Sequence, residues 1–191
     1  MVPRKRLPRD FYARPTLKVA RDLLGKFLTL EIAGSTKTAR IVEVEAYLAG
    51  RDPASHAYRG PTPRTAPMFG PPGRSYVYFV YGMYHCLNVV TEIDGVAGAV
   101  LLRGAEPLAG FDDAEPGALA GPGKLARAFG LTTKHTDLDL VRYGANLTVR
   151  DAPPVAPSRV VRSARIGLKK HATTDKPWRL YVRGSSGVSR Q

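Results

Sequence analysis

Two carboxylates, a tyrosine and a histidine lie close together in residues 40–56, RIVEVEAYLAGRDPASH. Residues 40–47 alternate like a β-strand, which puts Glu43, Glu45 and Tyr47 on one face and spaces the two glutamates about 7 Å apart. A carboxylate in an apolar setting can act as a general base on water, and we expect Glu45 to face a pocket in this role. Solvent exposure is the simpler interpretation of a polar strand face, and for Glu43 a structural ion pair with an arginine is favoured.

A group of aromatic residues lies in residues 76–84, YVYFVYGMY. Tyr78 is on one face of a predicted strand, and Tyr81 immediately precedes a turn at Gly82. An exposed ring at a hairpin tip is costly without a partner, and such a ring can enter a base stack and fill the gap left by an extruded nucleotide. Tyr78 can then stack on the extruded base, whereas an aromatic core cluster is the simpler explanation for the other rings of the segment.

Further candidates come from isolated polar residues. His56 can donate to a substrate atom or stack on one, although a structural histidine is the usual outcome. The amide of Asn88 can read a base edge or satisfy the backbone. Arg103 follows an apolar run, so it needs an acidic partner, and Glu45 with a bound water suits that need.

Phosphate contacts are predicted at two places. Residues 59–64, RGPTPR, supply Arg59, Thr62 and Arg64 in an irregular loop. Residues 121–124, GPGK, open a predicted helix, where backbone N–H groups and Lys124 can meet a phosphate. The spacing around Lys124 does not match a P-loop.

Metal and cofactor sites have no support in the sequence. Four scattered histidines and one cysteine give neither a zinc signature nor an iron–sulfur ligand set. A magnesium nuclease needs several convergent carboxylates, and Glu43 with Glu45 is the nearest approach to that pattern. We therefore expect no metal and no cofactor.

The net charge of +13 is concentrated at the two ends of the 191-residue chain. Residues 1–40 hold 10 basic and 3 acidic side chains, residues 41–158 hold 10 and 12, and residues 159–191 hold 9 and 1. Such a distribution suits a nucleic-acid backbone, with an anionic membrane surface as the main alternative. The chain has no apolar run long enough to span a membrane and no signal-peptide pattern, and its single cysteine fits a reducing compartment. We expect a cytoplasmic protein.

A sheet must position these side chains. The patterns predict one mixed α/β (α+β) domain over residues 1–191, with a curved, mainly antiparallel, partly open barrel-like sheet and peripheral helices. Residues 1–10 and 185–191 are expected to be loose tails. The predicted helices cover residues 17–24, with Thr16 as the cap, and 125–129; the predicted strands cover 26–32, 39–47, 75–80, 84–91, 97–103, 159–166 and 179–182.

Several blocks together resemble the eukaryotic-type alkyladenine (3-methyladenine) DNA glycosylases. The blocks are EAYLAGRDPASH (45–56), TPR (62–64), MFGPPGRSYVYFVYGMYHCLNVV (68–90), LLRGAEPL (101–108), GPGKLARAFGL (121–131) and RIGLKKHATTDKPWRLYVRG (165–184). The resemblance covers about residues 14–184 and indicates a bacterial member of that family. Three features depart from the family pattern and could alter lesion preference or DNA binding: His85, the pair Lys169 and Lys170, and a longer loop at 91–98.

The resemblance implies a monofunctional enzyme of DNA repair that needs no second catalytic carboxylate, and we expect a monomer. It implies that a damaged purine of the 3-methyladenine, 7-methylguanine and hypoxanthine class is flipped out of double-stranded DNA and released by hydrolysis of its N-glycosidic bond. The resemblance implies that Glu45 deprotonates the attacking water and that Arg103 helps to hold this water. It implies that the flipped purine is stacked between the side chains of Tyr47, His56 and Tyr78, and that Asn88 forms a pocket wall that discriminates between purines. It also implies that Tyr81, at the tip of a hairpin inserted into DNA, intercalates in the base stack.

The chemistry of the substrate agrees with one catalytic base. An N-alkylated purine already carries positive charge and leaves without protonation, and aromatic rings favour a cation. A neutral lesion such as hypoxanthine needs protonation, for which the sequence shows no dedicated acid. Two alternatives remain open: a non-catalytic nucleic-acid binder that uses the same cationic ends, and a metal-dependent nuclease that uses Glu43 and Glu45.

Overall fold

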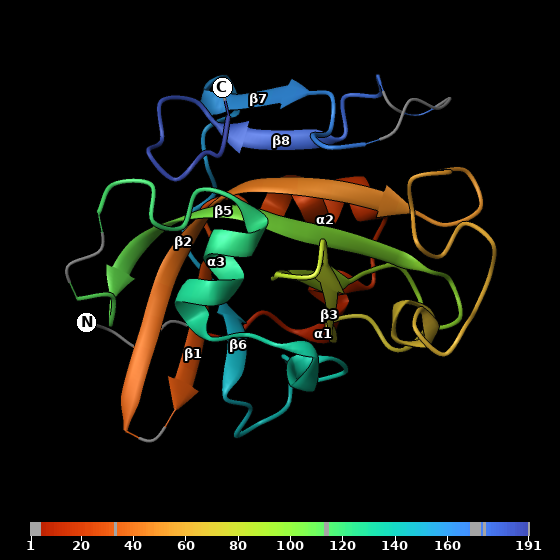
Figure 1. Ribbon diagram of the computed structural model, residues 1–191, viewed down its shortest axis with the longest axis horizontal. Helices are drawn as coiled ribbons and strands as arrows, with labels where there is room; N and C mark the ends of the chain where they lie inside the picture. The colour runs from red at the N-terminus through yellow and green to blue at the C-terminus, as the bar shows by residue number, and fades with distance from the viewer. Residues whose placement is uncertain (1–4, 33, 113–114, 169–172, 174, 191) are drawn as a thin grey trace.

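An antiparallel sheet of eight strands dominates the structure, a computed structural model that describes residues 5–32, 34–112, 115–168, 173 and 175–190. The main path of the sheet runs in the order β3-β4-β5-β2-β1-β6, and β8 pairs with both β2 and β7 beside it. It curls into a half-barrel, so the predicted mixed α/β fold with a curved antiparallel sheet is confirmed (Figure 1). The strands are β1 (Phe27–Ile32), β2 (Ser35–Leu48), β3 (Ser75–Val80), β4 (Tyr84–Val90), β5 (Gly98–Ala109), β6 (Leu147–Arg150), β7 (Val160–Ser163) and β8 (Arg179–Val182).

Strand β2 is the centre of this arrangement, because it pairs with β1, β5 and β8. Its residues from Ile41 to Ala46 are all buried, on both faces of the sheet. The register between β2 and β5 shifts on both sides of Glu43, which marks a β-bulge. Bulges redirect side chains and are common beside active sites. This one lies directly before Glu45.

Short helices cover the sheet. They are α1 (Arg9–Tyr12), α2 (Thr16–Leu23) and α3 (Pro122–Phe129), with 3-10 turns at Ala66–Phe69, Thr133–His135 and Pro157–Arg159. Helix α2 buries Val19, Ala20 and Leu23, whose spacing gives the helix one apolar face toward the core. The chain leaves α2 at Gly25, whose φ of +85° is easily adopted only by glycine.

The cap assigned to Thr16 is wrong. Thr16 is the first residue of α2, and Pro15 occupies the N-cap position. The Thr16 hydroxyl instead donates to the carboxylate of Glu92 at 2.6 Å and lies 2.9 Å from the hydroxyl of Thr91. A long-range partner has therefore replaced the local capping bond.

The predicted strands at 75–80 and 179–182 are confirmed with the same bounds, and those at 26–32, 39–47 and 84–91 are confirmed within a few residues. Two strand ends were wrong: β5 continues to Ala109 rather than 103, and β7 ends at Ser163 rather than 166. Strand β6 was not predicted. The chain leaves β7 early because the backbone N–H of Ile166 bonds to Glu45 instead of to a neighbouring strand.

The two ends of the chain are packed rather than loose within the described residues. Leu7 is buried in the core, and its N–H donates to Val149. Ser185 is also buried, and Ser189 bonds to Glu43. The expectation of loose tails therefore fails at these positions, since the tails supply backbone and side-chain partners to interior groups.

Lys169 and Lys170, which depart from the family pattern, lie outside the residues that the structure describes. Among the described residues, no helix is long and apolar enough to cross a membrane.

Candidate active site

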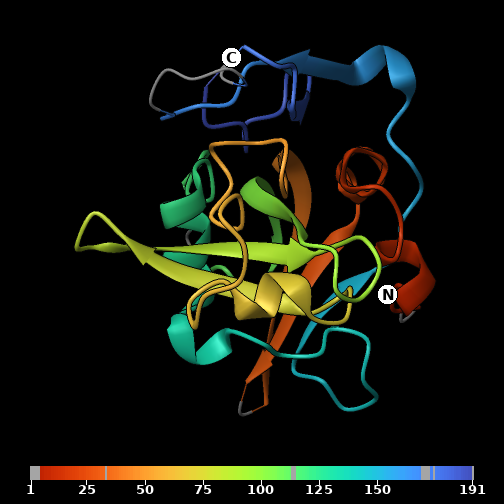
Figure 2. The same cartoon turned by 90° about the vertical axis from the view of Figure 1, so that its right-hand side faces the viewer.

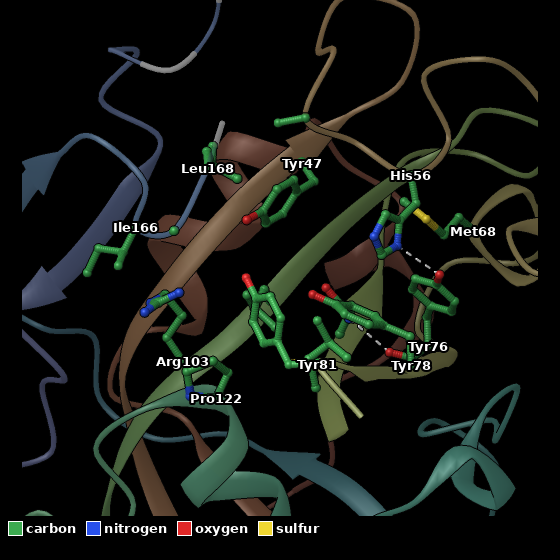
Figure 3. A pocket seen from close by; sticks show the side chains of 16 residues that line it. Tyr47, His56, Met68, Tyr76, Tyr78, Tyr81, Arg103, Pro122, Ile166 and Leu168 are labelled. Carbon is green, nitrogen blue, oxygen red and sulfur yellow. Dashed lines mark hydrogen bonds between the residues drawn. The ribbon is translucent and has the colours of Figure 1, made fainter. Parts of the chain in front are cut away.

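A cavity of about 380 Å³ opens beside the curled sheet, between the β3–β4 hairpin, the loop 54–68 and the segment 166–168 (Figure 3). It brings together six residues that the sequence analysis singled out separately. The lining residues include Tyr47, His56, Tyr76, Tyr78, Tyr81, Asn88, Arg103, Pro122, Ile166 and Leu168. Candidates that are up to 56 positions apart in the sequence thus share one concave site of a size suited to a small ring system.

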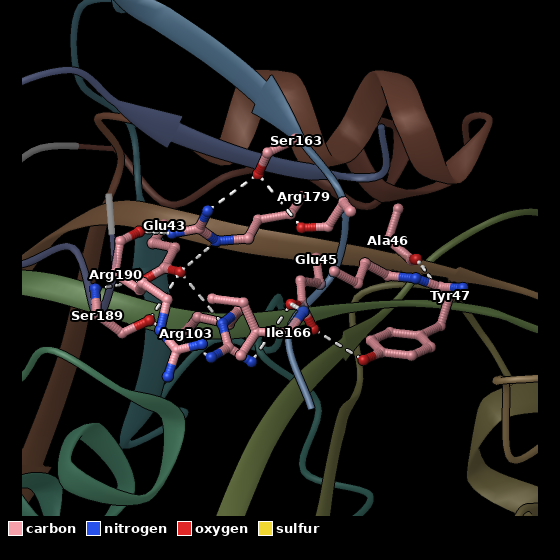
Figure 4. Close-up of polar contacts among 12 residues, drawn as sticks. Glu43, Glu45, Ala46, Tyr47, Arg103, Ser163, Ile166, Arg179, Ser189 and Arg190 are labelled. Carbon is pink, nitrogen blue, oxygen red and sulfur yellow. Dashed lines mark hydrogen bonds and ion pairs between the residues drawn. The ribbon is translucent and has the colours of Figure 1, made fainter. Parts of the chain in front are cut away.

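Glu45 does not itself line this cavity, and Figure 4 shows it among Tyr47, Arg103 and Ile166, which do. Its Oε2 accepts a hydrogen bond from the Tyr47 hydroxyl at 2.8 Å, and its Oε1 accepts one from the Ile166 N–H at 2.7 Å. Nη1 of Arg103 lies 3.3 Å from the same Oε1. All three partners line the cavity, but the Glu45 side chain is fully buried. Water must therefore displace or pass one of these donors to reach the carboxylate.

Glu43 does not line the cavity, although it shares the Arg103 guanidinium with Glu45. Its Oε1 accepts hydrogen bonds from Nε of Arg103 at 3.2 Å and Nε of Arg179 at 2.7 Å. Ser189 adds two more, from its hydroxyl at 2.9 Å and its N–H at 2.7 Å. The predicted structural ion pair of Glu43 with arginine is confirmed.

Arg103 connects the two glutamates. It is buried, with an exposed fraction of 7%. Burial alone would lower the pKa of its guanidinium, but Glu45 and then Glu43 raise that pKa above its usual value. Arg103 is therefore a permanent cation placed between an interior anion and the cavity.

The aromatic side chains meet across the cavity. Figure 3 shows Tyr47 on one side, and His56, Tyr76 and Tyr78 together on the other. The ring centroids of His56 and Tyr78 are 4.6 Å apart and edge-to-face. Because these two rings touch each other, a flat ligand fits between Tyr47 and the pair, not between His56 and Tyr78.

These aromatic groups are uncharged at neutral pH. Burial, and then Glu45, raise the pKa of Tyr47 well above its usual value. Burial also raises the pKa of Tyr78. Partial burial, and then the positive charge of Arg64, lower the pKa of His56 below its usual value. The cavity therefore presents neutral π systems, which attract a cationic ring.

The far wall of the cavity is formed by β4. The Asn88 amide is buried, and its Nδ2 donates to the Tyr76 carbonyl at 3.0 Å. One amide group thus satisfies the backbone while the residue still lines the cavity. Tyr76 also fixes the opposite wall, because its hydroxyl lies 3.0 Å from Nδ1 of His56.

Tyr81 occupies the tip of the β3–β4 hairpin, which extends beyond the rest of the sheet (Figure 2). Its side chain is 77% exposed although it also touches the cavity. Its φ is +54°, a left-handed conformation that costs a non-glycine residue about 1–2 kcal/mol. Gly82 follows with φ +70°, so the tight turn holds a strained, exposed ring at the cavity mouth.

The four residues predicted to contact phosphates lie on exposed surface. The guanidinium of Arg64 is 5.7 Å from the centre of the Tyr78 ring, so it borders the cavity. The Thr62 hydroxyl is 2.9 Å from that of Thr65 and helps to fold its loop. Lys124 is in the first turn of α3, next to the cavity residue Pro122, whereas Arg59 lies in the loop after His56. Their phosphate contacts stay predictions.

Sequence reasoning missed a buried ion pair that packs against the cavity residue Tyr47. Arg165 donates to both oxygens of Asp52, at 2.6 and 2.7 Å, and both side chains are fully buried. Its guanidinium lies 4.5 Å from the ring centre of Tyr47 and 5.0 Å from that of Trp178. The pair fixes the segment that brings Ile166 to Glu45. Asp52 and Arg165 both lie in the quoted sequence blocks, but they are 113 residues apart and no local pattern joins them.

Clusters of three or more His, Cys, Asp or Glu side chains that could hold a metal ion are absent from the described residues. Glu43 and Glu45, the close carboxylate pair noted in the sequence, form ion pairs with Arg103 and Arg179 instead. A cavity bordered by a buried carboxylate–arginine pair and neutral aromatic rings, on a curled sheet with a protruding hairpin, is a site for acting on a flat ring drawn out of a larger molecule.

Comparison with known proteins is consistent with this class of site. Residues 10–186 match the model of the family described as methylpurine-DNA glycosylase. A Myxococcus xanthus protein named as a candidate 3-methyladenine DNA glycosylase is 48% identical over 186 residues, which cover 96% of this chain and 93% of that protein. Proteins with the same name are 49% identical in Anaeromyxobacter dehalogenans (97% of this chain, 86% of that protein) and 45% identical in Methanocella arvoryzae (97% and 96%).

The chain belongs to the methylpurine-DNA glycosylase family. It is accordingly a DNA glycosylase, a hydrolase of N-glycosidic bonds that acts on methylated purines in DNA repair. The resemblance stated from the sequence blocks is confirmed.

Proposed function

We propose that this enzyme flips 3-methyladenine, 7-methylguanine and related damaged purines, including hypoxanthine, out of duplex DNA and hydrolyses the bond to the sugar, with Glu45 as the base. It leaves an abasic site, acts as a monomer in the bacterial cytoplasm, and needs no metal or cofactor. The observation that carries this proposal is Glu45 itself: a buried carboxylate whose three partners, Tyr47, Ile166 and Arg103, all line one aromatic cavity.

The reaction needs one base and no acid when the purine is alkylated. A water oxygen forms a bond to C1′ of the sugar while the bond from C1′ to the purine nitrogen breaks. The bonding electrons pass to the purine and neutralise its positive charge, and the water proton passes to Glu45. The transition state resembles an oxocarbenium ion, so the carboxylate also stabilises developing positive charge on the sugar.

Because Glu45 is buried, water reaches its carboxylate only if one of the hydrogen-bond donors around it moves. Among the described residues, Oε2 accepts a single hydrogen bond, from Tyr47. The Tyr47 ring is half-buried, whereas Ile166 donates through its backbone and Arg103 is buried. We infer that the Tyr47 hydroxyl gives way to the water when the purine enters, since hydrogen bonds of catalytic groups often rearrange between the free enzyme and the substrate complex.

Binding of the flipped purine is supported by the neutral rings of the cavity. Tyr47 stacks on one face of the base, and His56 with Tyr78 on the other. Asn88, held by the Tyr76 carbonyl, forms a rigid wall against which bulkier purines are screened. Because none of the three clamp residues is charged at neutral pH, an alkylated purine with its positive charge is favoured over a normal one.

The hairpin tip supports flipping. Tyr81 enters the stack in place of the purine, and the tight turn at Tyr81 and Gly82 presents the ring outward before DNA is bound. Replacement of Tyr81 by Ala removes a stacking contact of about 1–3 kcal/mol. We therefore expect roughly 10- to 100-fold weaker binding to a lesion-bearing duplex, measured by fluorescence anisotropy, with thermal unfolding close to that of the wild type. Unchanged affinity and unchanged flipping would exclude the wedge role.

One assay tests the proposed function against its two alternatives. Duplexes that carry a single 7-methylguanine or hypoxanthine are incubated with enzyme and then heated in alkali, which cleaves at abasic sites. We expect cleavage only after alkali, and the same yield in EDTA. Binding without alkali-labile sites would identify a non-catalytic binder, and cleavage that is independent of alkali and lost in EDTA would identify a metal nuclease.

A further inference from the structure

The carboxy-terminal segment, residues 185–190, docks in the interior of the sheet beside Glu43 (Figure 4). Ser185 anchors its start, because its hydroxyl donates to Glu106 on β5 at 2.6 Å. The carbonyl of Arg190 accepts a hydrogen bond from Arg179 on β8. The segment is therefore attached at both ends to strands that flank β2.

The docking requires two glycines to meet. A Cβ added to Gly104 on β5 would overlap the carbonyl of Gly187, and a Cβ added to Gly187 would overlap the carbonyl of Ala105. Neither glycine has a positive φ, so backbone freedom does not explain them. Their role is to let the segment approach β5 closely, which is the geometry of a built contact rather than of a trailing tail.

Ser189 is the residue that this approach delivers. It gives Glu43 two hydrogen bonds, and its hydroxyl also lies 3.4 Å from Nη2 of Arg103. The Arg103 guanidinium is thus held at Nε by Glu43 and at Nη2 near Ser189. The remaining nitrogen, Nη1, points to Glu45.

We propose that Ser189 is a positioning residue for catalysis, and that the carboxy-terminal segment sets the direction in which Arg103 faces Glu45 and the cavity. This proposal rests on the roles proposed above for Glu45 and Arg103. The physical reason is that a guanidinium is a rigid planar group, so fixing two of its nitrogens fixes the third. Without the Ser189 hydroxyl, Glu43 and Arg103 can rotate together, and Nη1 moves away from the carboxylate that activates water.

The alternative is a purely structural role, in which the segment only covers the sheet. The two roles differ in what they change. A cover affects folding and DNA binding together, whereas a positioning residue affects the rate of bond cleavage at unchanged affinity. Ser189→Ala separates them, because it removes one hydroxyl and keeps the backbone N–H that bonds to Glu43. Ser186→Ala is the matched control, since Ser186 is exposed in the same segment.

The experiment measures three quantities for each variant: the single-turnover rate of 7-methylguanine release, the affinity for a duplex with a stable abasic-site analogue, and the thermal midpoint. For Ser189→Ala we expect a rate loss of about 10-fold, and at least fivefold, with affinity and midpoint unchanged, since small displacements of a catalytic group are costly. Ser189→Thr, which restores a hydroxyl, is expected to recover the rate to within about threefold, and Ser186→Ala to match the wild type.

The outcomes are decisive when Glu45→Gln is assayed alongside. A loss below fivefold for Ser189→Ala, a loss matched by weaker binding or a lower midpoint, or no recovery in Ser189→Thr would overturn the positioning role while leaving the role of Glu45 intact. If Glu45→Gln keeps the full rate, the proposed function itself fails, and this result is recognisable whatever Ser189→Ala does.

Discussion

Glu43 and Glu45 are two buried carboxylates on one face of β2, two residues apart, and their surroundings differ. Among the described residues, Glu43 accepts bonds from Arg103, Arg179 and both polar groups of Ser189, all on the interior side. Glu45 accepts bonds from Tyr47 and Ile166, which line the cavity. Both carboxylates are buried on the same strand, so burial and strand position do not distinguish them. What distinguishes the structural anion Glu43 from the candidate base Glu45 is the set of hydrogen-bond donors around each carboxylate.

Arg103 makes the two carboxylates parts of one system. It contacts Glu43 through Nε and Glu45 through Nη1, at 3.2 and 3.3 Å. The interior half of this system is saturated with donors, whereas Oε2 of Glu45 keeps room for another. The comparison therefore predicts that changes at Glu43 act mainly on stability and that changes around Glu45 act mainly on the reaction.

The largest effect on stability is expected from Glu43→Gln. The change leaves the buried guanidiniums of Arg103 and Arg179 without their shared anion, and breaking a buried ion pair typically costs about 3–5 kcal/mol. We expect a loss of this size in the free energy of unfolding, measured by urea denaturation. The control is Glu45→Gln, which leaves Arg103 paired with Glu43 and is expected to cost less than about 2 kcal/mol. Equal losses for the two variants would erase the distinction between the carboxylates.

A smaller effect is expected from protonation of His56. Burial and Arg64 lower its pKa below the usual value of about 6.5, so the ring is neutral at pH 7.5 and becomes cationic only as the pH falls through that lowered pKa. The cation then repels a positively charged purine. With Glu45→Gln as a slow background, we expect the affinity for a 7-methylguanine duplex to weaken by up to about tenfold between pH 7.5 and 5.5.

The control for this pH dependence is a duplex with an uncharged abasic-site analogue, which corrects for effects of pH that do not depend on the charge of the base. His56→Gln should remove the difference between the two duplexes. A pH dependence that is the same for both duplexes would mean that His56 does not face the charged base.

The smallest effect is expected from Tyr47→Phe. The variant keeps the ring that stacks on the base and removes the hydroxyl that covers Oε2 of Glu45. Because a water can take the vacated position, we expect a single-turnover rate within about threefold of the wild type. A loss of about 100-fold would show that the hydroxyl orients the carboxylate instead of giving way to water.

Local patterns predicted the parts of the site that lie within one strand or turn. Alternation in residues 40–47 put Glu43 and Glu45 on one face, and the hairpin at Gly82 put Tyr81 at an exposed tip, as the structure has them. The same patterns could not tell the two carboxylates apart, since their donors come from residues as distant as Ser189. The charge distribution, Tyr81 at the hairpin tip and the resemblance to a family together selected Glu45, and the alternation alone did not.

The missed features all depend on contacts between distant segments. The Asp52–Arg165 pair joins residues 113 positions apart, and its charges look like surface charges in the sequence. The segment 185–190 lies in the chain end, residues 185–191, that was expected to be a loose tail, but the small residue Gly187 allows it to dock against Gly104. Small size indicates close packing as readily as flexibility, and only the three-dimensional partner decides between them.

The central claim is that Glu45, and not Glu43, activates water. Its most direct test is the single-turnover rate at which folded Glu45→Gln releases 7-methylguanine from a duplex that it still binds. We expect a fall of at least about 100-fold with affinity for the duplex retained, because a positioned base contributes about 10²–10⁴-fold to such a rate. A rate close to that of the wild type would contradict the account.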